Sequence, residues 1–187
     1  MPDVSPDSLP DVLAGPRLDL VLVTVDQLLS RDGHSTPVPL GFDDPDDVLN
    51  PADSPLRYRI PQVIADPSLN PWLIRLAVLR GDAPVIVGQA NFHDRPDAEG
   101  MVEIGYSVLP RHRGRGYATE IAMTMWRAAA PRADVRVLRA TVRPDNEASL
   151  RIIRGAGLVH VGEQDDPEDG LELIYELSAA DFLARHP

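Results

Sequence analysis

The sequence predicts an α/β (α+β) domain in which helices flank a central mixed, mostly antiparallel and twisted sheet. Three observations support this fold class. Apolar runs between residues 72 and 109 alternate with short polar turns, as in an antiparallel meander. Residues 116–130 carry apolar side chains at helical spacing. Beyond them, strand-like and helix-like segments alternate, the order expected when a parallel strand joins the sheet.

The length and composition fit one domain. The chain has 187 residues, of which 43% are hydrophobic and 25% are charged, values usual for a folded domain. Residues 1–16 contain four prolines among Asp and Ser and offer little to bury, so we predict a flexible or loosely docked N-terminal leader. Residues 17–187 are then predicted to form a single domain.

Neither a membrane span nor a secretion signal is visible in the sequence. The apolar runs fall short of the ~18 residues that a transmembrane helix needs. The first residues lack the basic and apolar regions of a signal peptide. We therefore expect a cytoplasmic protein that does not bind membranes.

The N-terminal third of the predicted domain is its least regular part. Residues 18–24 are rich in Leu and Val and predict a short strand, and residues 26–30 predict a helical turn. Gly and Pro recur through residues 31–55, so no long element is expected there. Residues 55–65 predict a helix that Pro61 would kink or end.

The middle of the chain predicts three antiparallel strands, at residues 72–79, 84–92 and 101–109. Residues 80–83 form the first hairpin turn, and the polar residues 92–100 form the second connection. The three strands together predict the meander at the centre of the sheet.

The C-terminal half predicts helices that alternate with strands. Residues 116–130 predict an amphipathic helix whose apolar face covers the sheet. Residues 135–142 predict a buried strand, which lies parallel to strand 101–109 if the helix between them makes a right-handed crossover. The remaining predicted elements are a helix at 147–156, strands at 158–162 and 171–177, and an acidic loop at 163–170.

The segment between strand 101–109 and helix 116–130 is rich in Arg and Gly, and we call residues 110–116 the Arg/Gly turn. Gly114 and Gly116 let the backbone curl tightly, so that its N–H groups can point at one spot. The helix that follows adds the positive end of its dipole, and three arginines surround the turn. The turn therefore predicts a phosphate site. Arg/Gly turns also occur as solvated loops or nucleic-acid-binding segments, but the flanking strand and helix favour phosphate.

The charge distribution supports an anion site at this turn. The net charge is −11, yet residues 111–160 hold ten Arg and four acidic side chains, a net charge of +6. This basic island lies in an acidic protein, which argues against nucleic-acid binding because such binding needs a basic surface. The acidic remainder could attract a cationic amine, or it could be an ordinary solvated surface.

The residue inventory excludes several kinds of site. The chain has no cysteine, so it has no disulfide, thiolate zinc site or Cys nucleophile. Its five histidines are scattered singly, without the H-E-x-x-H spacing of a metalloprotease. We therefore predict no catalytic metal.

Two motifs at matching separation resemble the acyl-coenzyme A binding core of GNAT-superfamily N-acetyltransferases. The first is Arg111-x-x-Gly114-x-Gly116-Tyr-Ala, preceded by Glu103-Ile-Gly-Tyr, and the second is Pro144-Asp-Asn146-x-x-Ser149. The likeness is greatest to the branch related to ribosomal-protein N-terminal (RimJ/RimL-like) acetyltransferases. It spans about residues 71–177, whereas residues 1–70 match less clearly.

The resemblance implies a GNAT-like fold with acetyl-CoA (coenzyme A) as co-substrate. In this family the two parallel central strands splay apart, and the pantetheine arm enters the gap like an extra strand. The Arg/Gly turn would then hold the pyrophosphate, and the second motif would line the middle of the cofactor. The implied cofactor-binding residues are Tyr106, Ser107, Val108, Arg111, His112, Arg113, Gly114, Arg115, Gly116, Tyr117, Ala118, Asn146 and Ser149.

Amine acetylation needs a base for the amine and a proton donor for the leaving thiolate. Glu103, at the position where related enzymes often carry a catalytic glutamate, is the first candidate base, although it could simply pair with an Arg on its strand. His93 is the second candidate, since imidazole titrates near neutral pH. The family's Tyr after the second motif is missing, which leaves Tyr175 as candidate acid, with water or Ser149 as alternatives.

The resemblance thus implies acetyl-CoA-dependent N-acetylation of a primary amine by direct attack on the thioester. The acceptor would be a protein N-terminus or a small-molecule amine, and the enzyme a monomer or homodimer. The alternative is a non-catalytic acyl-CoA-binding or sensor module of the same fold, because the general acid is not clearly assigned. A nucleic-acid module is disfavoured by the net charge.

Overall fold

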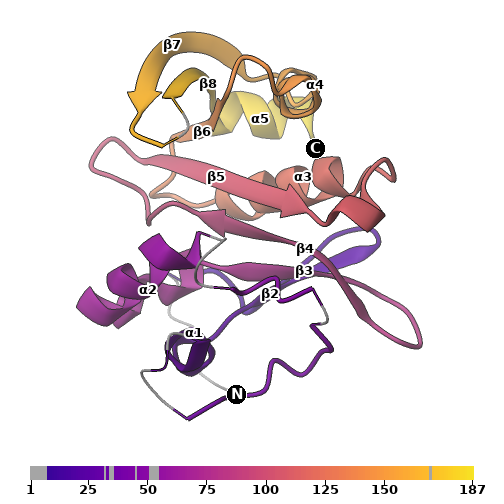
Figure 1. The fold of residues 1–187 in the computed structure, drawn as a ribbon. Coiled ribbons are helices and arrows are strands. Elements are labelled where there is room, and N and C mark those ends of the chain that lie inside the picture. The colour runs from indigo at the N-terminus through magenta and orange to yellow at the C-terminus, as the bar shows by residue number, and fades with distance from the viewer. Residues whose placement is uncertain (1–7, 32, 34–35, 45, 51–54, 169) are drawn as a thin grey trace.

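The computed structural model describes residues 8–31, 33, 36–44, 46–50, 55–168 and 170–187. These residues form an eight-stranded sheet in the order β1-β2-β3-β4-β5-β6-β8-β7, with helices on both faces (Figure 1). The strands are β1 Val12–Ala14, β2 Leu18–Leu22, β3 Arg75–Leu79, β4 Val85–Phe92, β5 Met101–Val108, β6 Val137–Val142, β7 Val159–Asp166 and β8 Gly170–Ser178. The α-helices are α1 Val25–Arg31, α2 Leu56–Ala65, α3 Tyr117–Ala129, α4 Glu147–Gly155 and α5 Ala179–Arg185, and the 3₁₀ helices are η1 Pro67–Trp72 and η2 Pro110–His112.

Neighbouring strands in this sheet are antiparallel, except for the central pair β5 and β6, which is parallel because α3 crosses over between them. The predicted mixed, mostly antiparallel sheet is therefore confirmed. β5 and β6 pair only through Met101–Glu103 and Val137–Arg139, although β5 continues to Val108. The two strands separate beyond Glu103, which leaves the rest of this edge of β5 without a β6 partner.

Two hydrophobic cores lie on opposite faces of the sheet. One core lies under α3, α4 and α5 and includes Ile121, Trp126 and Phe182, each fully buried. The other lies under α1 and α2, where Leu28 and Ile60 pack against β2, β3 and β4. The apolar face predicted for residues 116–130 therefore does cover the sheet.

The N-terminal segment is more ordered than its composition suggested. Residues 12–14 form β1, which pairs with β2, and the side chains of Leu9 and Leu13 are only 3% and 5% exposed. Of the two alternatives predicted for the leader, flexible or loosely docked, residues 8–16 fit the docked one, because two leucines among the prolines supply apolar surface that packs on the domain. Residues 1–7 lie outside the described residues.

A helix was predicted at residues 55–65 with a kink or an end at Pro61; helix α2 continues through Pro61 to Ala65, so Pro61 does not end it. Proline removes one helical N–H donor. The buried residues Leu56, Ile60 and Val63 hold the helix against the sheet and offset that loss.

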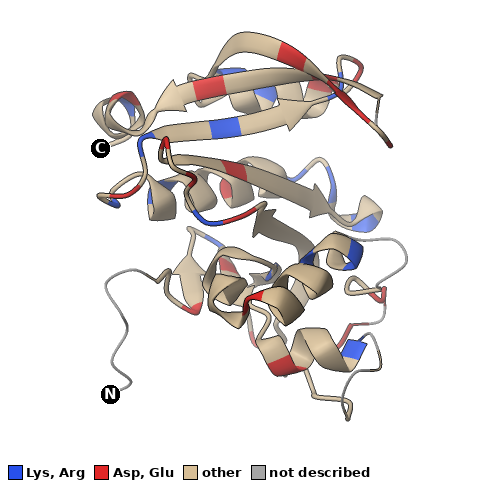
Figure 2. Ribbon diagram, turned by 90° about the vertical axis from the view of Figure 1, so that its left-hand side faces the viewer, with Lys and Arg blue, Asp and Glu red and all other residues tan. Residues whose placement is uncertain are grey.

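The C-terminal hairpin is also longer than predicted. The acidic residues expected in a loop lie mostly on β7, whose Glu163 and Asp165 pair with Leu173 and Leu171 of β8. Acidic residues recur along both strands (red near the top of Figure 2). Backbone pairing, rather than side-chain burial, extends this edge strand, and charge on an edge strand also discourages pairing with another chain. Helix α5, which follows β8, was not predicted.

The helices of the described residues are too short or too polar to span a lipid bilayer. His, Cys, Asp and Glu side chains in that part of the chain form no group of three or more that could hold a metal ion.

Candidate functional site

The Arg/Gly turn forms because two of its glycines adopt left-handed backbone. Gly114 has a φ of 74° and Gly116 a φ of 80°, conformations that residues with a side chain adopt only with strain. Helix α3 begins at Tyr117 with no side-chain cap. The backbone N–H groups of Gly114 to Thr119 donate to no acceptor in the described residues. Open donors at a helix N-terminus form a ready anion site.

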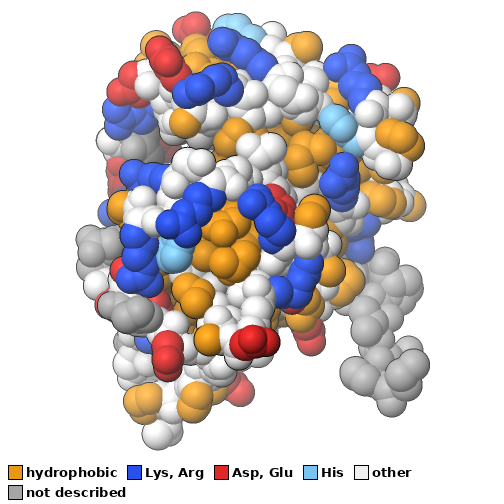
Figure 3. Space-filling model, turned by 90° about the vertical axis from the view of Figure 1, so that its right-hand side faces the viewer, with side chains coloured by type: hydrophobic (Ala, Val, Ile, Leu, Met, Phe, Trp, Pro, Cys, Tyr) orange, Lys and Arg blue, Asp and Glu red, His pale blue; other side chains and the backbone are white. Residues whose placement is uncertain are grey.

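The arginines of the turn have different neighbours. Arg111 pairs with Asp46 at 2.5 Å, and Arg113 Nε donates to the carbonyl oxygen of Val108 at 2.9 Å. Arg115 has an exposed side chain. Basic side chains surround an apolar area on the side of the molecule that carries the turn (Figure 3). Of the three arginines of the turn, Arg111 and Arg113 are thus already bonded to protein groups.

The arginines of the turn affect the protonation of His112. Its Nε2 accepts a hydrogen bond from Arg111 Nε at 3.1 Å. Burial and the positive charges of Arg111 and Arg115 lower the pKa of His112, so the ring is neutral near pH 7. The backbone N–H groups of His112 and Arg113 donate to nearby carbonyls and are not available to a ligand.

Tyr106 and Ser149 meet where β5 and β6 have separated. Tyr106 is on β5 and Ser149 is in the first turn of α4, whose N-cap Asn146 accepts from the Ser149 amide at 3.1 Å. The Tyr106 hydroxyl is buried next to Ser149, and it has no hydrogen-bond partner of normal geometry among the described residues. Burial raises the pKa of Tyr106, and Ser149 opposes this rise only in part. The phenol therefore stays protonated and has a hydrogen to donate.

A cleft of about 910 Å³ opens on the opposite face of β5, between α2 and the β7–β8 hairpin. Its floor carries side chains from β4, β5 and β6. Arg57 of α2 and Glu168 of the hairpin form an ion pair across it. The polar side chains that line the cleft include Arg59, Asn91, His93, Glu103 and Thr141.

The two candidate bases are neighbours in this cleft. His93 Nδ1 lies 3.5 Å from Glu103 Oε1, and the Thr141 hydroxyl donates to the same carboxylate oxygen at 2.5 Å. Glu103 is the last β5 residue paired with β6, so the pair sits at the apex of the gap. A Cβ at Gly105 would lie 3.2 Å from His93 Nε2, so the glycine leaves room for the ring.

The electrostatic surroundings keep His93 neutral at pH 7. Burial lowers the pKa of His93, the Glu103 carboxylate raises it, and the Arg59 guanidinium lowers it, with a net decrease. The side chain is still 43% exposed, so water in the cleft can reach the ring. A neutral imidazole next to a carboxylate can accept a proton from a bound amine.

Arg59 and Asn91 build the wall of the cleft, and neither was predicted. Arg59 is 9% exposed; its Nε donates to Asn91 Oδ1 at 3.0 Å and its Nη1 to Gln62 Oε1 at 2.9 Å. Gln62 in turn donates to the carbonyl of His93 at 3.1 Å, which ties α2 to the end of β4. One feature of the sequence could have pointed to these two residues. Both are polar residues within apolar segments: Arg59 precedes the core residue Ile60, and Asn91 lies in a buried strand.

Tyr175, which was predicted as a candidate proton donor, does not line the cleft. It pairs with Ala140 of β6, and its side chain is 3% exposed in the core under α3, α4 and α5. Its hydroxyl bonds to Arg154 Nη2 of α4 at 2.8 Å. The alternation of a strand places Tyr175 on the face opposite Thr141 and Glu103.

Comparison with known proteins identifies the family to which the chain belongs. The family model described as acetyltransferase (GNAT) domain matches residues 45–159, more than half of the chain. Among curated proteins, the chain is 32% identical over 88 residues to the uncharacterized N-acetyltransferase YjdG of Bacillus subtilis (strain 168), a match covering 47% of this chain and 50% of that protein. The chain thus spans about half the length of the first curated relatives that it matches.

Solved structures share the fold at low identity. Mutant forms of the spermidine/spermine N-acetyltransferase SpeG from Vibrio cholerae superpose with a TM-score of 0.62 at 12% identity, covering 91% of this chain and 100% of that chain. RimL, a ribosomal L7/L12 alpha-N-protein acetyltransferase in complex with coenzyme A, gives 0.59 at 14%, covering 89% and 97%. The structural likeness shows the fold, and the family match shows that this chain belongs to the GNAT acetyltransferase family.

Proposed function

We propose that this protein transfers the acetyl group of acetyl-CoA to a primary amine. One observation carries the proposal: a neutral imidazole beside a carboxylate lies at the apex of the gap between β5 and β6, and β5 leads from there to a helix start with open amides. A base beside one end of β5 and an anion site beyond its other end are what acetyl transfer from acetyl-CoA to an amine requires. The relatives named as N-acetyltransferases, and the coenzyme A bound to RimL, support the same activity.

The chain's own residues fit acetyl-CoA. The pyrophosphate would accept hydrogen bonds from the amides of Gly114 to Ala118, and the free edge of β5 at Tyr106 to Val108 would pair with the pantetheine amides. A Cβ at Gly114 would meet no atom within 4 Å, so the surface above the turn is open. Bound there, acetyl-CoA supplies an electrophilic thioester carbonyl.

In this proposal His93 removes a proton from the incoming amine. Its neutral form predominates at pH 7 because its pKa is lowered. Glu103, fixed by the Thr141 hydroxyl, orients the ring and stabilises the imidazolium that forms. The same carboxylate is the alternative base, acting on the amine directly or through water.

Tyr106 replaces Tyr175 as our candidate proton donor for the leaving thiolate. Its hydroxyl lies in the gap between β5 and α4, beside Ser149, and its raised pKa keeps it protonated. Ser149 could relay a proton to it from solvent. This assignment supplies the acid that the sequence lacked, since the family's Tyr after the second motif is missing.

The acceptor is a primary amine, either a protein N-terminus or a small molecule. Figure 2 shows acidic positions on the β7–β8 hairpin, and Asp166, Glu168 and Glu172 line the cleft there, where a protonated amine would be attracted. Likeness to both RimL and SpeG supports a place near the RimJ/RimL-like branch without deciding between the two classes of acceptor.

The test is thiol release from acetyl-CoA with a panel of peptides bearing free N-termini and a panel of small amines, including polyamines. We expect turnover with at least one class, and saturable binding of CoA by calorimetry. Binding of CoA without thiol release for any amine would instead indicate a non-catalytic acyl-CoA-binding module. Absence of CoA binding would refute the proposal.

A further inference from the structure

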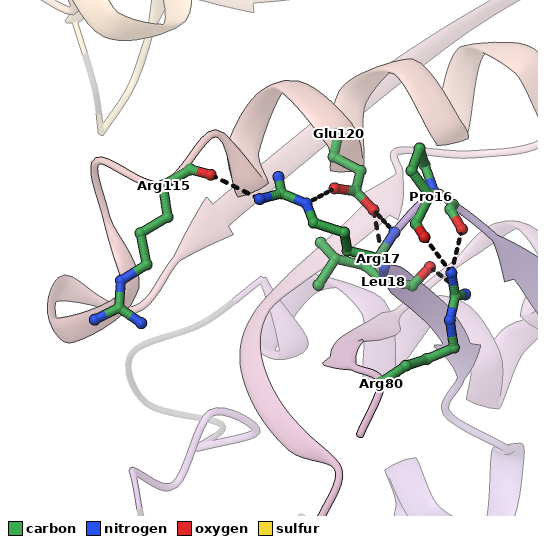
Figure 4. A network of polar contacts seen from close by, with 7 residues as sticks. Pro16, Arg17, Leu18, Arg80, Arg115 and Glu120 are labelled. Carbon is green, nitrogen blue, oxygen red and sulfur yellow. Dashed lines mark hydrogen bonds and ion pairs between the residues drawn. The ribbon is translucent and has the colours of Figure 1, made fainter. Parts of the chain in front are cut away.

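A single buried carboxylate ties the N-terminal segment to α3. Glu120 of α3 is 9% exposed, and its Oε1 accepts hydrogen bonds from the backbone amides of Arg17 at 2.5 Å and Leu18 at 2.8 Å (Figure 4). Its Oε2 accepts from Arg17 Nε at 2.8 Å. Burial alone would raise the pKa of Glu120, but these hydrogen bonds outweigh it and the pKa is lowered. The carboxylate therefore stays ionised and holds Arg17 beside the helix start.

From this position the Arg17 guanidinium touches the Arg/Gly turn. Its Nη1 donates to the carbonyl oxygen of Arg115 at 3.1 Å, and the group stacks 4.7 Å above the ring of Tyr117. Its Nη2 lies 3.5 Å from the place of a Cβ on Gly116. One side chain from the N-terminal segment thus contacts Arg115 and Tyr117, the residues on either side of Gly116.

The contact with Arg115 has a consequence for the next amide. The carbonyl of Arg115 and the N–H of Gly116 belong to one trans peptide group, so they point in opposite directions. By holding the carbonyl, Arg17 directs the Gly116 N–H away from itself. That amide is one of the open donors at the start of α3.

We propose that Arg17 is a positioning residue for the pyrophosphate of acetyl-CoA, acting through the Arg115–Gly116 peptide rather than as a direct ligand. The inference rests on the proposed function. It extends the cofactor site to residues 17 and 120, about a hundred positions apart in sequence. A preorganised donor does not have to be reoriented when the anion binds, which improves affinity.

The experiment compares CoA and dephospho-CoA binding by calorimetry in the wild-type protein and three variants. Arg17→Lys keeps the positive charge but cannot donate in one plane to both Glu120 and Arg115. Glu120→Gln releases the guanidinium and also makes the surroundings of the turn more positive. Arg80→Ala is the matched control, because Arg80 bonds to Gly15, Pro16, Leu18 and Asp19 and does not contact the turn.

We expect Arg17→Lys and Glu120→Gln to weaken both ligands about fivefold to tenfold, and Arg80→Ala to leave affinity within about twofold. If Arg17 acted through its charge, Arg17→Lys would bind like the wild type and Glu120→Gln would bind more tightly. A loss confined to CoA would indicate direct contact with the 3′-phosphate. An equal loss in Arg80→Ala would indicate general loosening of the segment. Any of these three results would overturn the inference.

A readout without ligand separates this inference from the proposed function. In the free protein, the Gly116 amide resonance should move in Arg17→Lys and Glu120→Gln but keep its position in Arg80→Ala. An unmoved resonance in Arg17→Lys would overturn the inference even if wild-type acetylation is confirmed. A moved resonance in a protein that does not bind CoA would leave the peptide geometry correct and refute the proposed function, and with it the role in binding CoA.

Discussion

The Arg/Gly turn and the cleft are the two ends of one candidate site, and they are built in different ways. The turn comes from one continuous segment, and it works through backbone N–H groups that two left-handed glycines bring to the surface. The cleft works through side chains that α2, β4, β5, β6 and the β7–β8 hairpin contribute separately. A backbone site tolerates most changes of side chain, whereas a side-chain site depends on a few identities.

This difference predicts that the largest losses of activity come from the cleft. His93→Ala should lower kcat/KM about 10²- to 10³-fold, because it removes the base while the turn remains intact. The Kd for CoA should stay unchanged. The measurement is steady-state thiol release beside calorimetry, with Glu176→Gln as control, since Glu176 pairs with Arg139 outside the cleft lining. Activity of His93→Ala near the wild-type value would transfer the role of base to Glu103 or water.

Substitution of Tyr106, in the gap between β5 and α4, should cause the next largest loss of activity. Tyr106→Phe removes only the hydroxyl, so kcat should fall about 10- to 100-fold with little change in CoA binding, as expected for loss of a general acid. Tyr175→Phe is the matched control, because its hydroxyl accepts a hydrogen bond from Arg154 and Tyr175 does not line the cleft. Equal losses in the two variants would point to disturbed packing, and no loss in Tyr106→Phe would leave the proton to Ser149 or water.

CoA binding at the Arg/Gly turn should be weakened more by a substitution that strains the backbone than by removal of a side chain. Gly116→Ala places a methyl group on a residue with φ 80°, where the nearest atom is 3.5 Å away, so any cost comes from the backbone conformation. That cost is about 1–2 kcal/mol. If the backbone relaxes to relieve this strain, the amides at the start of α3 turn away from the ligand. We expect calorimetry to show about tenfold weaker CoA binding. Gly155→Ala, in an open helical position, should change neither binding nor activity.

These two regions also differ in how far the sequence could predict them. The turn was predictable because its signal is local: a strand, two glycines and a helix follow each other without interruption. His93 and Glu103 were each predicted as candidates, but their contact depends on the antiparallel pairing of β4 with β5, which brings position 93 beside position 103. Spacing along the chain does not encode that distance.

Other parts of the site depend on contacts that no local pattern shows. Arg59 resembles an ordinary surface residue of an amphipathic helix until α2 is packed on the sheet and buries it against Asn91. The face that Tyr175 occupies could not be predicted, because one step along a strand moves a side chain to the other face. The prolines of the N-terminal segment indicate a flexible or loosely docked leader, and only the fold shows that Leu9 and Leu13 dock it beside α3.

The smallest expected effect is a shift in pH dependence, and its sign tests the electrostatics of the cleft. His93 acts as a base only when neutral, so kcat/KM should fall as the pH drops through its lowered pKa. Arg59→Gln removes a positive charge that lowers this pKa, which should move the acid limb to higher pH. Glu103→Gln removes a negative charge that raises it, which should move the limb of the remaining activity to lower pH.

The two shifts are opposite in sign, so they distinguish charge from structural damage, which would lower activity without moving the limb. Arg59→Lys keeps the charge at the wall of the cleft and should leave the limb in place. The measurement is kcat/KM across the acidic range for the three variants and the wild type. If Arg59→Gln and Glu103→Gln moved the limb in the same direction, the titrating group would not be a base lying between these two charges, and His93 would lose its assigned role.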